Sequence, residues 1–138
     1  MWENLSQMSL RIASLLLALL AQSDPKLPVP DAAAQKNAEK LLQEIFKDDY
    51  AKRSPVDKAA LAAKMTAQAR EVKDDPVSRF VLYREAQSLY TAAGDGEGAL
   101  AAIDELSKLY AVDGVAMKSA LFASLTKAAK TPEDWTKL

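Results

Sequence analysis

In this chain of 138 residues, the acidic side chains are the ones whose type and spacing come closest to a metal site or an acid–base catalytic site. Asp95-Gly96-Glu97-Gly98 resembles the start of a calcium loop, which needs oxygen ligands at its first, third and fifth positions and glycine at its sixth. Ala99 takes the fifth position and Leu100 takes the sixth, so a ligand and the sharp turn are both missing. We therefore predict a turn between two helices at this segment, without a metal ion.

Two carboxylate pairs, Asp48-Asp49 and Asp74-Asp75, would suit acid–base catalysis only where a pocket raises the pKa of one member. Neighbouring residues on a helix point about 100° apart, so neither pair converges on one substrate atom. We predict that these carboxylates cap and solvate helix ends. Asp75 precedes Pro76 and is a predicted N-cap.

The segment Tyr83-Arg84-Glu85, with Arg79 one turn earlier, offers a phenol, two guanidinium groups and a carboxylate. Ordinary surface ion pairs, worth well under about 1 kcal/mol each, account for such a group. Tyr50 and Trp135 lie outside the clearest apolar stripes and would mark a contact surface if exposed. The predicted interaction surface comprises Tyr50, Arg79, Arg84 and Trp135. The other large aromatic side chains are expected in the core: Phe46, Phe80, Tyr83, Tyr90, Tyr110 and Phe122.

Composition removes several kinds of active site. The chain has no histidine and no cysteine, which excludes disulfides, thiolate nucleophiles, Cys/His zinc sites and a Ser-His-Asp triad. Its 18 basic and 19 acidic residues leave a net charge of −1, which argues against a nucleic-acid partner. We predict that the chain is not an enzyme and binds no cofactor.

Residues 1–23 have the layout of a secretory signal peptide, because Arg11 precedes the uncharged run Ile12–Ala21 and small residues follow it. The run is shorter than the about 20 residues of a full membrane span. We expect export and an extracytoplasmic location, with a retained N-terminal anchor and a buried first helix as alternatives. Residues 24–30 contain three prolines, which predict a stiff spacer between leader and domain.

Helix-start signals divide the rest of the chain. We predict an all-α domain over residues 31–138 with five antiparallel helices, in a bundle or in a repeat-like array of helical hairpins. Gly94 is expected to end the third helix in a left-handed conformation. The five helices are predicted to start at Asp31, Ser54, Asp75, Gly98 and Asp113.

Apolar residues three and four apart predict the buried face of each helix. The first helix is predicted to run from Asp31 to about Lys52, and its buried face comprises Ala34, Ala38, Leu41, Leu42, Ile45 and Phe46. The buried face of the fifth helix comprises Val115, Leu121, Phe122, Leu125 and Ala129. Thr131-Pro132 begins one more helix by the same rule, only a few residues before Leu138. This predicts either a chain cut out of something longer or a short piece that docks Trp135 onto the bundle.

Two resemblances concern these helices. The stretch Ala86–Tyr110 resembles a tetratricopeptide-like helical hairpin, through Leu89, Tyr90, Ala93-Gly94-Asp95, Ala99-Leu100 and Ala102. Seven segments together resemble a helical region of exported planctomycete-type bacterial proteins: Lys26–Asp31, Asp48–Tyr50, Ser54-Pro55, Asp74–Pro76, Tyr83–Ala86, Ala93–Asp95 and Ala101–Leu106. This second resemblance implies a preceding signal peptide and further extracytoplasmic domains downstream, and it assigns no activity to any residue.

These observations favour a non-catalytic, exported scaffold or protein-interaction module of the cell envelope. A concave apolar face would accept a peptide or a partner helix. The first alternative is an accessory domain that positions a larger extracytoplasmic enzyme. The second is a membrane-tethered structural subunit, in which residues 1–21 are retained and provide the contact with the membrane.

Overall fold

The computed structural model describes residues 24–129, and within this range the secondary structure is helical, as predicted. The leader and the helix start at Thr131 lie outside the described residues. The helices are α2 (Ala32–Ile45), α3 (Lys47–Tyr50), α4 (Pro55–Glu71), α5 (Pro76–Ala93), α6 (Gly96–Leu109) and α7 (Gly114–Ala128).

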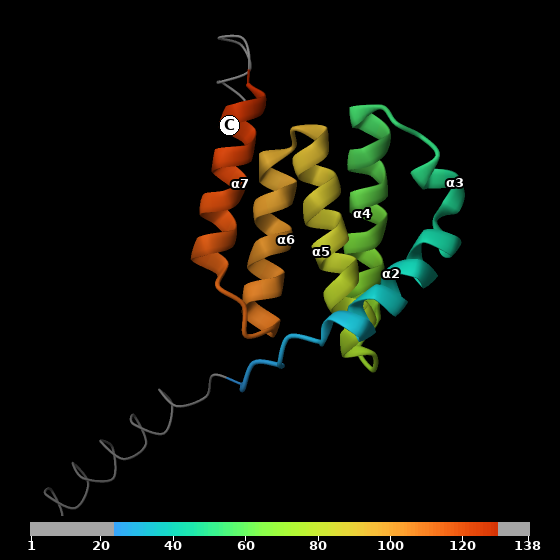
Figure 1. The fold of residues 1–138 in the computed structure, drawn as a ribbon, viewed down its shortest axis with the longest axis vertical. Helices are drawn as coiled ribbons and strands as arrows, with labels where there is room; N and C mark the ends of the chain where they lie inside the picture. Colours follow the sequence, from blue (N-terminus) through green and yellow to red (C-terminus); the bar gives the residue numbers. More distant parts are fainter. Residues whose placement is uncertain (1–23, 130–138) are drawn as a thin grey trace, which may run out of the picture.

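The four long helices α4 to α7 lie side by side, and consecutive ones run in opposite directions (Figure 1). Each of them contacts chiefly its neighbours in sequence, so they form a row. α2 crosses this row obliquely and packs on α5, while α3 packs on α4 (Figure 1). α5 therefore has neighbours on several sides, whereas α7 stands at the end of the row.

Side-chain caps start the helices where the sequence predicts them, with one exception. A side-chain oxygen accepts a hydrogen bond from the backbone N–H three residues on, which satisfies a donor that the helix itself leaves free. Asp95 provides such a cap for Gly98, at 2.8 Å, so α6 begins at Gly96 rather than at the predicted Gly98. The caps at predicted positions are Asp31, Ser54, Asp75 and Asp113.

Two glycines shape the corner between α5 and α6. Gly94 ends α5 with φ of 77°, the left-handed conformation that the sequence predicts there. Gly98 faces the ring of Tyr90, and a Cβ at this position would lie 2.5 Å from a ring carbon. Glycine at this point therefore allows α6 to approach α5 closely.

The predicted first helix differs from the structure in two ways. It breaks at Phe46 (φ −102°, ψ 21°), so that α3 follows as a separate short turn. Leu41 and Ile45, both expected to be buried, are 52% and 62% exposed. The physical reason is the oblique crossing, because α2 touches the row along a narrow line that buries only Ala38 and Leu42.

The core has a large part and a small part. The large part lies between α2, α4, α5 and α6, where Met65 and Val81 are fully buried. In it the rings of Phe80 and Tyr110 pack edge-to-face, with their centroids 5.0 Å apart. The small part joins α6 to α7 through Ala99, Ile103, Leu121 and Leu125.

Two large side chains of the predicted fifth stripe lie outside this core. Val115 is 77% exposed and Phe122 is 45% exposed, which corrects both predictions. Both lie on α7, which has a helix neighbour on one side only within the described residues, so part of its apolar surface faces solvent.

The proline-rich segment, predicted to be a stiff spacer, is hydrogen-bonded to the domain through Leu27. The Leu27 N–H donates to the Leu109 carbonyl at 2.9 Å, and the Leu27 carbonyl accepts from the Ala111 N–H at 2.9 Å. Tyr110 between these partners is extended, so the two segments pair as a single parallel β-bridge. Leu27 itself packs on the large core, which the proline pattern alone does not indicate.

Candidate functional site

Arg84, a member of the predicted interaction surface, connects α5 to α2. Its guanidinium donates to the Gln35 side-chain carbonyl and forms ion pairs with Glu39 and with Glu85, the latter at 3.1 Å. The Gln35 amide in turn donates to the Pro30 carbonyl at 2.6 Å. Charge-assisted bonds of this kind fix geometry, so Arg84 holds α2 and the end of the proline-rich segment against α5.

Tyr50 belongs to the same contact region. It is half-buried, and its hydroxyl donates to Glu85 Oε2 at 3.4 Å. Burial, together with the nearby Glu85 carboxylate, raises the pKa of Tyr50 to about 12. The phenol is therefore neutral at ordinary pH and acts as a hydrogen-bond donor that ties α3 to α5.

Arg79 also lies in an internal contact. Its Nε donates to the Tyr110 hydroxyl at 3.3 Å, and its guanidinium carbon lies 5.9 Å from the centroid of that ring. The Tyr110 hydroxyl donates onward to the Pro76 carbonyl at 2.7 Å. Arg79 thus helps to close the start of α5 against the end of α6. Trp135, the fourth predicted residue, lies outside the described residues.

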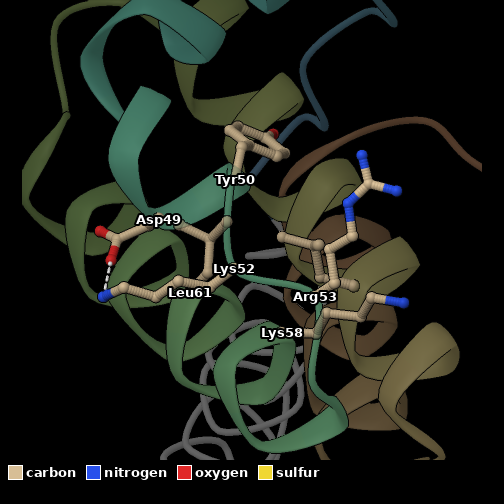
Figure 2. Close-up of a pocket in the computed structure, with 7 residues that line it drawn as sticks. Asp49, Tyr50, Lys52, Arg53, Lys58 and Leu61 are labelled. Carbon is tan, nitrogen blue, oxygen red and sulfur yellow. Dashed lines mark hydrogen bonds and ion pairs between the residues drawn. The ribbon is translucent and has the colours of Figure 1, made fainter.

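An open cavity of about 300 Å³ lies next to Tyr50, between α3, the start of α4 and α5 (Figure 2). On one side Lys52 pairs with Asp49 at 3.2 Å, and on the other side the Arg53 and Lys58 side chains extend away from Asp49 (Figure 2). Apolar lining comes from α4 and α5. The lining residues are Asp49, Tyr50, Lys52, Arg53, Lys58, Leu61 and Leu89.

Positive charge predominates at this cavity. Asp49 accepts from Lys64 at 2.8 Å as well as from Lys52, and these hydrogen bonds lower the pKa of its carboxyl, Lys64 having the larger effect. Within residues 24–129, no carboxylate pairs with Arg53 or Lys58. The nearby Asp57 does not line the cavity and instead accepts the Ser54 hydroxyl proton at 2.6 Å.

The local fold explains why these cations gather. Ser54 caps α4 and Pro55 begins it, so the preceding residues Lys52 and Arg53 stand at the corner where the chain enters the helix. Lys58 follows one turn into α4 and therefore returns to the same side. A pair of unpaired cations above an apolar surface is suited to hold an anion that carries an apolar neighbour.

Sequence reasoning missed Arg53 and Lys58. The available signal is the presence of basic residues on both sides of the Ser54-Pro55 helix start. These basic residues indicate a binding cavity only when the fold places Tyr50 of α3 and Leu89 of α5 beside them.

Two of the other depressions on the described surface have different linings. One, of about 180 Å³, lies between α5 and α7 and is lined by uncharged residues that include Met117 and Leu121. The other, of about 410 Å³, lies beside Phe46 and includes Lys64 and Glu71. Neither of them brings two unpaired basic side chains together with an apolar lining, as the cavity at Tyr50 does.

Residues 24–129 offer neither a membrane-spanning helix nor a cluster of metal ligands. In this range no helix combines the length and the apolar character that crossing a membrane requires. The same part of the chain contains no group of three or more acidic side chains placed to hold a metal ion. Comparison with family models, curated proteins and solved structures finds no match to this chain.

Proposed function

We propose that this chain is a non-catalytic, exported helical interaction module, and that the cavity at Arg53 and Lys58 binds an acidic segment of a partner protein. The observation that carries this proposal is the pair of cations without a carboxylate partner among the described residues, next to the apolar side chains Leu61 and Leu89. The export part of the proposal rests on the signal-peptide layout of residues 1–23.

The chemistry of the cavity supports an acidic peptide as its ligand. A carboxylate can accept charge-assisted hydrogen bonds from both Arg53 and Lys58, while a neighbouring apolar side chain covers Leu89. Attraction between exposed charges is screened by salt, so such binding is expected to weaken as ionic strength rises. The row of antiparallel helices supports a hairpin array, rather than a closed bundle, as the scaffold for this cavity.

The test is an NMR titration of the full chain with a short polyglutamate peptide that ends in a leucine. We expect saturable shifts of the Arg53, Lys58 and Leu61 amides, and loss of these shifts in the Arg53→Glu/Lys58→Glu double variant. Lys36→Glu is the matched control, because Lys36 is an exposed cation on α2 and does not line the cavity. Equal binding by the double variant and by the control would contradict the proposal.

The pairing of Leu27 favours a second candidate, a membrane-tethered subunit. Because Leu27 is bonded to the corner between α6 and α7, a retained leader would leave only a few residues between membrane and domain. Mass spectrometry after expression in an exporting host distinguishes the candidates. An intact chain with Met1 supports the tether, and a mature chain that begins at Asp24 contradicts it.

A further inference from the structure

Asp49 is the only carboxylate among the described residues that line the cavity at Arg53 and Lys58. Its two side-chain oxygens accept from Lys64 at 2.8 Å and from Lys52 at 3.2 Å. These hydrogen bonds lower the pKa of Asp49, so its carboxyl stays ionised and holds both lysines at ordinary pH. Asp49 therefore takes, beside Lys52, a place that a carboxylate of a ligand would otherwise fill.

The turn that follows α3 brings Lys52 back beside Asp49. The Lys52 N–H donates to the Asp49 carbonyl at 3.2 Å, and the side chains of the same two residues form an ion pair. The Lys52 side chain thus runs toward Asp49, whereas Arg53 and Lys58 extend away from it (Figure 2). Three basic residues line the cavity, and within residues 24–129 only two of them lack a carboxylate partner.

The Lys52 side chain is free to turn once its partner is removed. It is 56% exposed, and its charge stands on a flexible four-carbon stem. An exposed ion pair contributes little stability, so a small difference in free energy decides whether Lys52 faces Asp49 or the cavity. Loss of the Asp49 carboxylate would also remove its repulsion of an incoming carboxylate. Both effects increase the negative charge that the cavity can hold.

We propose that Asp49 sets the charge selectivity of the cavity: by holding Lys52 aside, it favours a single carboxylate next to an apolar residue over a dense run of acidic residues. The inference rests on the proposed function, because it concerns the same cavity and an acidic ligand. One carboxylate can accept from both Arg53 and Lys58 while its apolar neighbour covers Leu89. Further carboxylates meet the negative charge of Asp49 and find Lys52 already paired.

NMR titration of the full chain with two peptides tests the selectivity. Both peptides have blocked ends, and one carries a single glutamate before a leucine whereas the other carries three. We expect Asp49→Asn to bind the three-glutamate peptide about two- to fivefold more tightly than the parent chain, the range that an exposed ion pair allows. For the single-glutamate peptide, the gain should be smaller, because Arg53 and Lys58 already suffice for one carboxylate.

Asp48→Asn is the matched control. It changes the net charge by the same amount at the neighbouring residue, which is exposed and does not line the cavity. This variant should keep the parent's preference between the two peptides. Equal gains in Asp48→Asn and Asp49→Asn would contradict the selectivity alone, whereas no saturable binding to the parent or to Asp49→Asn would contradict the proposed function and, with it, this inference.

Lys52→Gln shows whether the gain comes from the released lysine. In the parent chain Lys52 faces Asp49, so the substitution should change the affinity by less than about twofold. In the Asp49→Asn chain it should remove most of the gain, as expected for two coupled residues. A double variant that keeps the whole gain would overturn the proposal, as would losses of equal size in the parent and in Asp49→Asn.

Lys64→Gln separates the release of Lys52 from a loosening of α3. It breaks the contact that Asp49 makes with α4 and leaves the pair of Asp49 with Lys52 in place. This variant should bind neither peptide more tightly than the parent does. A gain as large as that of Asp49→Asn would overturn the proposal, because it would assign the effect to movement of α3 and not to the charge of Lys52.

Discussion

The middle and the end of the helix row have similar apolar spacing and different environments. α4 and α5 carry apolar residues at helical spacing, and Met65, Ala69 and Val81 there are fully buried. α7 has the same kind of spacing, yet Phe122 is 45% exposed. The difference follows from the number of neighbours, because α5 contacts α2, α4 and α6 whereas α7 contacts mainly α6. Apolar periodicity therefore predicts which residues are available for burial, and position in the row decides which are buried.

Met65→Ala at the middle of the row should have the largest effect on stability. Truncating this fully buried side chain removes its contacts and leaves a cavity, at an expected cost of about 2–5 kcal/mol in the free energy of unfolding. Val115→Ala at the end should change that free energy by less than about 0.5 kcal/mol. Urea denaturation of both variants, followed by circular dichroism, measures the comparison. Equal losses would contradict the distinction between middle and end.

Gly98→Ala should have an intermediate effect, at the joint between α5 and α6. The added Cβ would lie 2.5 Å from the Tyr90 ring, and such overpacking costs about 1–3 kcal/mol. The same denaturation measurement applies. Tyr90→Leu in the Gly98→Ala chain removes the ring and should recover part of the loss, and the absence of any recovery would show that the close approach is not the cause.

Tyr50→Phe should have the smallest effect, visible only in the pH dependence of stability. The pKa of Tyr50 is raised from 10.0 to about 12 in the folded chain, so the folded state holds the phenol proton more tightly than the unfolded state. The corresponding stabilisation is complete below pH 10 and is lost as the pH rises toward about 12. The variant should lack this part of the alkaline decline, as denaturation at a series of pH values can measure.

Tyr83 provides the internal control for that experiment. Burial is the main cause that raises its pKa as well, and it remains in the Tyr50→Phe variant. A residual alkaline decline is therefore expected. An unchanged decline would mean that the contact of Tyr50 with Glu85 does not persist in solution.

The charged residues at the candidate site could be predicted from the sequence only in part. Arg79 and Arg84 are parts of the predicted interaction surface, and in the structure both make contacts between helices. Tyr50 borders the open cavity, although its hydroxyl is directed to Glu85. The sequence does not single out Arg53 and Lys58, because basic residues next to a helix start are common. They indicate a binding site only through the side chains that the fold places opposite them.

The helical class and most helix starts can be predicted from local sequence signals alone. Capping by Asp31, Ser54, Asp75 and Asp113 and the left-handed Gly94 are local events, which depend on residues within one turn of the chain. Their signals can be read without knowing what lies nearby in space.

Which apolar faces are covered and which charges are paired depends on contacts between distant parts of the chain. Arg84 meets Gln35 across 49 positions of sequence, and Leu27 pairs with the chain at the far end of α6. The exposure of Ile45 and Phe122 likewise follows from where α2 crosses the row and where the row ends. These outcomes depend on contacts between distant segments, and neither helical spacing nor local charge specifies which segments will meet.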